Sequence, residues 1–461
     1  MVNTGDTAWI LTSASVVLLM TPGLALFYGG MVRAKSVLNM MMMSFGALGL
    51  ISVLWVLYGY SIAFGNDVGY GLLGDPTEYL GLNGLMADVT SEAGGLPSMA
   101  FVGFQAVFAI ITVALISGAI ADRAKFGAWM VFAGVWATIV YFPIAHWVFD
   151  FTLTDDDGVV THVGGWVANN LVAVDFAGGT AVHINAGAAG LALALVLGKR
   201  RGFGKDLVRP HNLPLVMIGA GLLWFGWFGF NAGSAVAANN TAAVAWVNTL
   251  VAAGAASLGW LLVEKLRDGH ATSLGGASGV VAGLVAITPS CSAVSPVGAI
   301  LLGAVAGGLC ALAVGLKYRF GYDDSLDVVG VHLVGGLVGT LGVGFVATAA
   351  APAGVDGLFY GGGADQLWRQ AVGAFAVLIT SFVLTYIIGL VIQTTMGFRV
   401  DEEDEMTGID TAVHAESAYD FTSLGGGGGG AVTGGGGGAP YAGGSRSTAG
   451  TANSAARGGS A

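Results

Sequence analysis

Charged residues are scarce in this sequence. Only 10% of its 461 residues are Asp, Glu, Lys or Arg, whereas a soluble domain carries about 25%. Cysteine is scarcer still, since Cys291 and Cys310 are the only two and neither stands at a spacing typical of a metal cluster. Phosphate-binding loops, nucleophile elbows and HExxH patterns are also absent. These absences exclude an ordinary water-soluble domain, and they predict neither an enzyme nor a bound cofactor or metal.

Basic residues are outnumbered by acidic ones, so the formal net charge is −11 at pH 7. The acids lie mostly in predicted loops and in the C-terminal tail, which argues against nucleic acid as a partner. Hydrophobic residues, in contrast, make up 55% of the chain, and the mean hydropathy is +0.76. Together these values predict an all-α cell-membrane protein that crosses the lipid bilayer many times.

Eleven apolar runs approach the roughly 20 residues that a helix needs to cross a bilayer. The eighth and ninth runs are the weakest, because only a very short loop containing Pro289 and Pro296 separates them. The predicted spans are 8–30, 37–64, 98–120, 126–149, 178–198, 213–234, 242–264, 273–289, 297–315, 328–350 and 367–393.

Lysine and arginine before position 320 occur only in loops that follow odd-numbered spans. The positive-inside rule therefore places these loops in the cytoplasm, the N-terminus outside and the C-terminus inside. An odd number of spans agrees with this orientation. The residues are Arg33, Lys35, Arg123, Lys125, Lys199, Arg200, Arg201, Lys205, Arg209, Lys265, Arg267, Lys317 and Arg319.

Two histidines stand in matching frames, Val-His-x-x-x-Gly-x-x-Gly, at His183 and His332. They fall in the fifth and tenth spans, so five spans separate them and the second half enters the membrane from the opposite side. This arithmetic predicts an inverted 5+5 repeat, with half-repeats at about 8–198 and 213–350 and a bracing helix at about 367–393. A site near the midplane, between the two halves, is expected.

The histidines allow two interpretations. Each could simply be hydrogen-bonded within a helix bundle, or the pair could line a path, since a neutral imidazole has one donor and one acceptor. Ionisable groups at membrane depth are a functional hypothesis by default, and the matching frames favour the path. Metal binding is the weaker use, because no third ligand stands nearby.

Aromatic residues gather toward the predicted outer face, including Phe108 and the stretch from Trp227 to Phe230 that precedes Ser234. They form either an interfacial belt or, with the Ser234 hydroxyl, a site for a small cation. Asp175 lies just before the fifth span. It either caps that helix or orients a cation site without touching the cation.

The composition changes after Gly397. Residues 1–396 form the predicted transmembrane domain, and residues 397–421 are an acidic segment that we interpret as a cytoplasmic regulatory tail. Residues 422–461 are rich in glycine, cannot bury a core and are predicted to be disordered.

At these residues the chain resembles the ammonium transporter family of Amt, Mep and Rh proteins, and the Amt branch in particular. The resemblance covers about residues 7–421. Its specific motifs are Asp175-Phe-Ala-Gly-Gly-Thr-Ala-Val-His183, Gly226-Trp-Phe-Gly-Phe-Asn-Ala-Gly-Ser234, Asp327-Val-Val-Gly-Val-His332, Ala121-Asp-Arg123 and Gly397-Phe-Arg-Val-Asp-Glu-Glu.

The resemblance implies a homotrimer of eleven-helix subunits, each with its own pore. His183 and His332 would be its twin pore histidines, and Phe108 and Phe230 a stacked phenyl gate above them. The outer ammonium site would be formed or supported by Ser234, Asp175 and Trp227. The tail would resemble a segment that couples subunits and meets a PII-type signal protein.

The chain departs from the family pattern at one place. The family's recruitment tryptophan usually follows His-x-x-Trp directly before a Gly-Gly-Gly run, whereas here residues 150–162 are inserted before Gly164. Phe149 could replace that tryptophan, or Trp147 or Trp166 could serve, and the sequence leaves the three open.

The resemblance favours transport over two rivals. Ammonium would bind outside and lose a proton, and ammonia would cross the pore, with the proton either staying outside or travelling along the histidines. A bare ion in apolar surroundings is very costly, which is why deprotonation is expected. An ammonium sensor or regulatory platform and an Rh-type gas channel are the alternatives, and the Gly-rich tail without a predicted signalling domain argues against the sensor.

Overall fold

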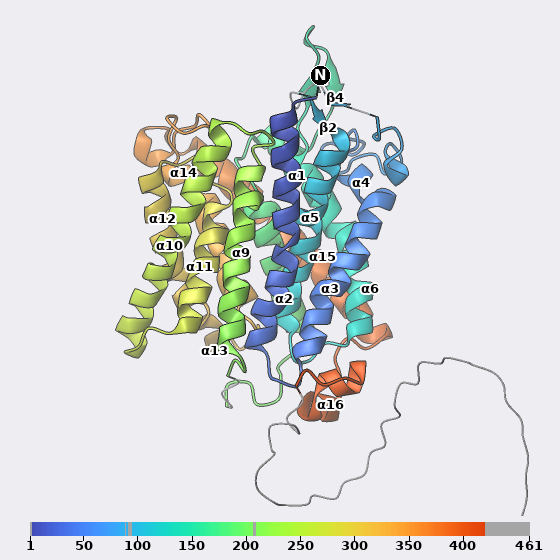
Figure 1. Cartoon of the computed structure of the whole chain (residues 1–461), viewed down its shortest axis with the longest axis vertical. Helices are drawn as coiled ribbons and strands as arrows, with labels where there is room; N and C mark the ends of the chain where they lie inside the picture. The colour runs from blue at the N-terminus through green and yellow to red at the C-terminus, as the bar shows by residue number, and fades with distance from the viewer. Residues whose placement is uncertain (1, 88, 91–94, 206–208, 420–461) are drawn as a thin grey trace, which may run out of the picture. The chain divides into compact units, whose positions relative to one another are not determined.

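The computed structural model describes residues 2–87, 89–90, 95–205 and 209–419. The predicted disordered residues 422–461 lie outside this part of the chain. Figure 1 shows the long helices side by side, with the N-terminus at one end of the bundle and α16 near the other. We call these ends the N-terminal face and the tail face.

The described residues are mostly α-helical, in agreement with the predicted all-α class. The α-helices are α1 Thr4–Leu18, α2 Met20–Met31, α3 Val37–Leu54, α4 Tyr60–Phe64, α5 Ser98–Ile116, α6 Phe126–Trp136, α7 Phe142–Phe149, α8 Asn185–Leu197, α9 Leu213–Gly233, α10 Asn240–Asp268, α11 Ser273–Ile287, α12 Pro296–Ala313, α13 Leu316–Phe320, α14 Val334–Val346, α15 Asp365–Thr395 and α16 Glu402–Thr407.

Short 3₁₀ and π turns join or continue these helices. The 3₁₀ segments are η2 Leu80–Leu82, η3 Ser117–Ile120 and η8 Leu358–Tyr360, and the π segments are η1 Trp55–Gly59, η4 Ala137–Tyr141, η5 Val167–Leu171, η6 Gly179–Ile184, η7 Val329–Leu333 and η9 Asp410–His414. A π turn inside a helix often marks a functional site. Both singled-out histidines lie in such turns, His183 in η6 and His332 in η7.

Two small antiparallel strand pairs decorate the loops. Strands β1 Val89–Thr90 and β2 Leu96–Pro97 pair through Val89 with Pro97, and β3 Leu153–Thr154 and β4 Val160–His162 pair through Leu153 with His162. The second pair is built from the predicted insert. The Asp155 carboxylate accepts hydrogen bonds from two backbone N–H groups at its tip, as an exposed turn requires.

Several helix starts follow from capping residues in the sequence. The Asn239 side chain accepts a hydrogen bond from Ala242 N at the start of α10, and Thr272 does so from Gly275 N at the start of α11. Ser295 caps α12, where Pro296 occupies the first helical position. These are the preferred residues for such positions, because they satisfy N–H groups that have no partner within the helix.

Ten helical segments are long and apolar enough to cross a membrane, among the described residues. Each overlaps one of the predicted spans. The eighth predicted span corresponds to α11, which at 15 residues is shorter than a crossing normally requires. The count of eleven therefore stays a prediction, while a multi-pass membrane protein is established.

Helix α15 contacts both halves of the bundle. Its Ser381 hydroxyl donates to Asn185 O at the start of α8, and its Gln370 side chain donates to Val174 O and to Thr340 O in α14. Hydrogen bonds between buried side chains and backbone are effective ties in a medium without water. The long helix thus holds the two histidine-bearing segments together.

Candidate functional site

His183 and His332 meet in the centre of the bundle. Their Nδ1 atoms are 3.3 Å apart, their rings are 24° from parallel, and both side chains are almost completely buried. One nitrogen of this contact must donate and the other accept, so the two neutral rings adopt different tautomers. Among the described residues, His183 Nε2 has no hydrogen-bond partner. The pair therefore shares one proton and offers a polar atom to a small guest.

Glycines explain why the two histidine segments come so close. A Cβ on Gly187, four residues after His183, would lie 2.5 Å from Leu333 N. A Cβ on Gly336, four residues after His332, would lie 2.9 Å from Ile184 Cγ1. Each repeated glycine thus accommodates the segment that carries the other histidine, as small residues do at membrane helix contacts.

The Asp175 carboxylate caps the segment that carries His183. It accepts hydrogen bonds from four successive backbone N–H groups, at 2.5 to 3.2 Å, and from the Thr180 hydroxyl. Negative charge at a helix N-terminus is stabilising, because the N–H groups there have no partner within the helix. Asp175 is half-buried and keeps some contact with solvent.

Asp324, which the sequence reasoning missed, does the same for the segment that carries His332. Its carboxylate accepts from Val328 N at 3.1 Å and from Val329 N at 2.7 Å. The signal was available, because Asp324 precedes His332 by the same eight residues that separate Asp175 from His183. The repeated frame is therefore longer than the Val-His-x-x-x-Gly pattern suggested.

Burial raises the pKa of the Asp324 carboxyl to about 6, with Asp327 adding to the rise and Lys317 opposing it. Its neighbour Asp323 behaves differently. Burial also acts to raise the pKa of Asp323, but hydrogen bonds and charge from Arg200 and the charge of Arg123 outweigh it and lower that pKa below its usual value. Adjacent carboxyls on the tail face thus differ in sign of shift.

Aromatic rings form a column above the histidines. The rings of Phe108 and Phe230 stack with centroids 4.2 Å apart and 25° between planes, and Phe230 lies 6.1 Å from the His183 ring. Both phenylalanines are buried. Trp227 lies beside His183 at 5.3 Å and donates its Nε1–H to Thr288 Oγ1. Trp227 therefore belongs to the histidine level of the column.

A narrow cavity of about 10 Å³ lies at this level, bounded by Leu115, His183, Leu223, Trp227, Phe230 and His332 among others. This is about the space that one water-sized molecule needs. Its walls are apolar except for the histidines and the tryptophan. The cavity therefore fits a small neutral solute with hydrogen-bonding capacity and disfavours a hydrated ion.

A much larger cavity of about 690 Å³ opens beside the N-terminal end of α1, and we call it the mouth cavity. It is lined by Asp6, Tyr60, Glu78, Phe149, Asp150 and His162 among others. Ser234 is not part of this lining, although the next three residues are. The Ser234 hydroxyl donates to Phe230 O at 2.8 Å, which places it one helical turn after the stacked ring.

Phe149 is the aromatic residue that joins the mouth cavity to the ring column. Its ring meets that of Phe108 edge-on at 6.3 Å, and it lines the cavity. Trp147 instead donates to Leu72 O and packs against Trp166 at 5.8 Å, and neither tryptophan lines the cavity. Of the three open candidates, the geometry favours Phe149.

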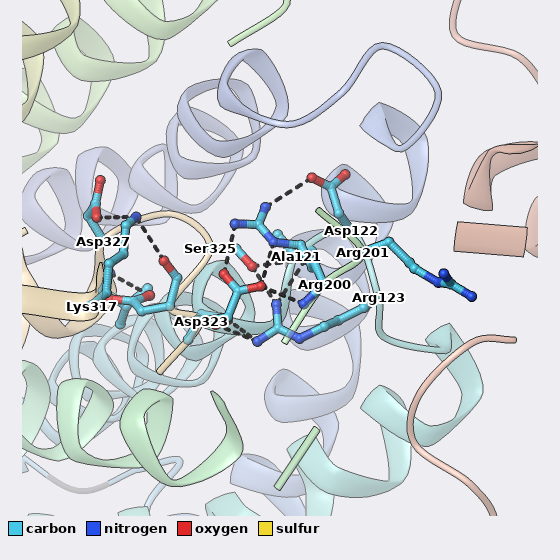
Figure 2. A network of polar contacts seen from close by, with 12 residues as sticks. Ala121, Asp122, Arg123, Arg200, Arg201, Lys317, Asp323, Ser325 and Asp327 are labelled. Atoms are coloured by element: carbon cyan, nitrogen blue, oxygen red, sulfur yellow. Dashed lines mark hydrogen bonds and ion pairs between the residues drawn. The ribbon is translucent and has the colours of Figure 1, made fainter. Parts of the chain in front are cut away.

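A network of ion pairs joins the loops of the tail face (Figure 2). Arg200 contacts Asp323 at 2.9 Å and Asp122 at 3.3 Å, and Arg33 lies 3.5 Å from Asp122. Arg123 is fully buried and donates to Asp323 O and to Ser325. Buried charges require such partners, and the network thereby fixes four loops relative to one another.

The acidic tail segment packs on this network. Arg399 Nη2 lies 2.7 Å from Glu405 Oε2, and the same carboxylate accepts from Arg201 N at 2.7 Å. Further along, the Asp410 carboxylate accepts from Leu38 N and Asn39 N at the start of α3. The described part of the tail is therefore folded onto the loops.

The fold and the site together define a class of protein: a multi-pass membrane protein with a narrow path lined by aromatic rings and two buried histidines. Within the described residues, no group of three or more His, Cys, Asp or Glu side chains is arranged to hold a metal ion. The geometry is that of a pathway for a small polar solute.

Comparisons with known proteins agree with this class. A sequence profile described as the Ammonium Transporter Family matches residues 8–419. The ammonium transporter of Mycobacterium tuberculosis is 63% identical over 442 residues, which cover 92% of this chain and 91% of the relative. The ammonium transporter of Bacillus subtilis is 44% identical, with 90% of this chain and 98% of the relative covered. The chain therefore belongs to the ammonium transporter family.

Solved structures extend the likeness to the whole bundle. The crystal structure of Saccharomyces cerevisiae Mep2 matches with a TM-score of 0.79 at 33% identity, covering 87% of this chain and 88% of Mep2. A structure named Sensor Amt Protein matches with a TM-score of 0.79 at 28% identity, covering 88% of this chain and 98% of its own.

Proposed function

We propose that this chain transports ammonium across the cell membrane and that the translocated species in the centre of the bundle is ammonia. The contact between His183 and His332 behind the stacked rings of Phe108 and Phe230 carries this proposal. The space beside the histidines holds about one water-sized molecule. A cation entering it would lose its hydration without gaining a charged partner, so deprotonation beforehand is energetically favoured.

The earlier steps take place at the mouth cavity. Ammonium is attracted by the acidic lining, which includes Asp6, Glu78 and Asp150, and meets the ring of Phe149. Phe108 and Phe230 then act as a gate that excludes water and hydrated ions. Ser234 and Asp175 support the binding step, the first at the end of α9 and the second by holding the His183 segment. Trp227 shapes the path beside His183.

The histidine pair decides where the proton goes. If the proton stays at the mouth, transport is electroneutral. If it moves along the shared Nδ1 contact from one ring to the other, transport carries charge. Both versions use the same residues, and they differ in whether ammonium evokes a current.

We further propose that the chain forms eleven transmembrane helices with the N-terminus outside and the C-terminus in the cytoplasm. The two half-repeats, residues 8–198 and 213–350, would be related by inverted topology, with 367–393 as the bracing helix. This is supported by the eight-residue spacing from Asp175 to His183 and from Asp324 to His332, and by the reciprocal contacts of Gly187 and Gly336.

Regulation through the tail completes the proposal. Residues 397–419 contact loops from several helices through Arg399, Glu405 and Asp410, so a protein that binds the tail could change those loops. A PII-type signal protein is the partner that the family resemblance implies, and a homotrimer is the implied assembly. The folded tail also motivates the sensor alternative, which the likeness to the Sensor Amt Protein keeps in view.

The decisive experiment measures ammonium-evoked current and ammonium uptake with purified protein in liposomes. We expect His183→Ala combined with His332→Ala to lower transport or its selectivity over potassium at least tenfold, about 1.4 kcal/mol of barrier. The exposed His270→Ala serves as the matched control and should behave like the unmodified protein. Unchanged uptake and selectivity in the double variant would reject the histidine path. Uptake without current would reject the electrogenic version, and neither uptake nor current would favour the sensor.

A further inference from the structure

The inserted hairpin builds a second cluster of histidines and carboxylates, far from the pore pair in composition and close to the mouth cavity. His162, at the end of β4, places Nε2 within 2.8 and 2.9 Å of the two Asp150 carboxylate oxygens. His146 Nδ1 lies 3.1 Å from Asp150 Oδ2, and His146 Nε2 lies 3.3 Å from Asp67 Oδ1. Asp150 thus stands between two imidazoles, and Asp67, His146, Asp150 and His162 form one chain of contacts.

The partners of His146 determine its protonation. Its Nδ1 faces Asp150 Oδ2 and also Ala63 O at 3.3 Å, while its Nε2 faces Asp67. Burial acts to raise the pKa of Asp67, but hydrogen bonds from Gly71 N and Gly69 N and the interaction with His146 lower it overall, so Asp67 is ionised at neutral pH. Both ring nitrogens therefore meet acceptors, and an imidazolium satisfies both contacts.

His162 is the member of the chain that is open to change. Its side chain is 13% exposed and it lines the mouth cavity, whereas His146 is fully buried. A solvent-accessible histidine titrates near pH 6.5, within the range that an external medium covers. Protonation adds a positive charge to an existing hydrogen bond with Asp150, which strengthens that contact.

Asp150 transmits this to the path because it follows Phe149 directly in the chain. Phe149 is the last residue of α7, its ring meets Phe108, and it lines the same cavity. The backbone of Asp150 is held as well, since its carbonyl oxygen accepts from Gly165 N at 2.9 Å and from Asn169 Nδ2 at 3.0 Å. The side-chain contacts of Asp150 are thus the adjustable part of what fixes Phe149.

We propose that Asp150 and His162, braced by His146, are positioning residues that hold Phe149 at the entrance and that they hold it more firmly in acid. The inference rests on the proposed ammonium transport. It is specific to this chain's insert, residues 150–162, because that insert supplies both Asp150 and His162.

The sign of the pH effect follows from the surrounding charges. The titratable groups that contact the cluster or line the same cavity are Asp6, Tyr60, Asp67, Glu78, Tyr79 and His146. Apart from His146, all are acids or phenols, so they favour a positive charge on His162. As the pH falls through the histidine range, His162 gains its proton while Asp150 remains ionised, and the contact tightens. As the pH rises, the charge is lost and only a neutral hydrogen bond remains.

The test compares the KM for ammonium of three proteins in liposomes, with the pH on the mouth-cavity side set to about 5.5 or about 7.5, on either side of the histidine range. Ammonium stays almost wholly protonated over this interval, so its concentration does not change. For the unmodified protein we expect KM to be about three- to fivefold lower in acid, with kcat changing less. His162→Gln keeps a neutral donor and should show the higher KM at both pH values. His162→Lys keeps a permanent charge and should show the lower KM at both.

The controls separate this inference from other effects. His270→Gln replaces an exposed histidine elsewhere and should retain the pH dependence of the unmodified protein. The pore histidines are present in every variant, so their titration is common to all curves. Phe149→Ala should abolish the pH dependence of KM, because the proposed positioning acts through that ring.

Several outcomes would overturn the proposal. Both His162 variants could follow the pH dependence of the unmodified protein, or Phe149→Ala could retain it. Transport that is normal in size with an unaltered pH profile rejects only the positioning role. A loss of all ammonium transport in the unmodified protein would instead reject the proposed function, so the two failures are distinguishable.

Discussion

The two histidine half-sites use the same local device under different solvation. In each, a carboxylate eight residues before the histidine caps a π turn, and a glycine four residues after it accommodates the opposite segment. Asp175 accepts from four backbone N–H groups and a hydroxyl and stays half-buried. Asp324 accepts from two backbone N–H groups and is 1% exposed. A repeat therefore conserves geometry more strictly than electrostatics.

The glycines offer the strongest way to break this symmetry. Gly187→Ala would place a methyl group 2.5 Å from a backbone nitrogen, which cannot move without shifting the helix. Gly336→Ala would meet the Ile184 side chain at 2.9 Å, which can rotate away. We expect Gly187→Ala to cost roughly 1–3 kcal/mol and to impair transport, and Gly336→Ala to cost clearly less.

The measurement is thermal stability together with ammonium uptake for both variants. Gly221→Ala, on a glycine whose added Cβ would meet no heavy atom within 4 Å, serves as the control for a methyl group in a membrane helix. Equal effects of Gly187→Ala and Gly336→Ala would contradict the difference between backbone and side-chain neighbours.

The carboxylates give a smaller effect that depends on pH. The raised pKa of Asp324, about 6, lies above the unfolded value of about 3.9. The folded protein therefore binds a proton that the unfolded chain does not, and the contribution of Asp324 to stability falls as the pH rises from about 4 to about 6. Asp324→Asn should flatten this part of the profile, shifting the apparent melting temperature by a few degrees near neutral pH.

Melting temperatures from about pH 4.5 to 7.5 would check this, since the interval spans the titration of a carboxyl near pH 6. Asp155→Asn, in the exposed hairpin turn, removes one carboxylate without touching a histidine segment and is the control. A profile for Asp324→Asn that keeps the slope of the unmodified protein would contradict the assignment to Asp324.

The smallest expected effect concerns the one hydroxyl that only the first half-site has. Thr180→Val removes the hydrogen bond to the Asp175 carboxylate and should cost about 1 kcal/mol. Thr340→Val is the matched change in α14, where the buried hydroxyl oxygen has no hydrogen-bond partner among the described residues. That change should be neutral or stabilising, and a larger loss of stability in Thr340→Val than in Thr180→Val would contradict this ordering.

Much of the fold could be predicted because membrane helices announce themselves by length and apolarity. Each predicted span overlaps a helix, and the weakest, residues 273–289, corresponds to the short helix α11. The motifs around His183 and His332 also pointed to a shared site. Asp324 escaped notice because the interpretation compared the residues after each histidine more carefully than those before it.

Other features could not be predicted, because they depend on which side chains meet across the bundle. Trp147, Phe149 and Trp166 were equivalent candidates in the sequence, yet only Phe149 lines the mouth cavity and meets Phe108. The assignment of Trp227 to the outer ammonium site also rested on its motif alone, and its ring lies beside His183. The insert read as a plain solvated turn and gave no hint that Asp150 would stand between two histidines.

The sequence by itself determined that the protein belongs in a membrane, since a chain with so little charge and so many long apolar runs has no stable form in water. It also determined the repeated frame that carries His183 and His332. Only the tertiary structure decided that these two histidines touch, and that Phe149 stands at the mouth. Composition and periodicity report the solvent that each helix faces, whereas a contact between residues 149 positions apart depends on how closely two backbones can approach.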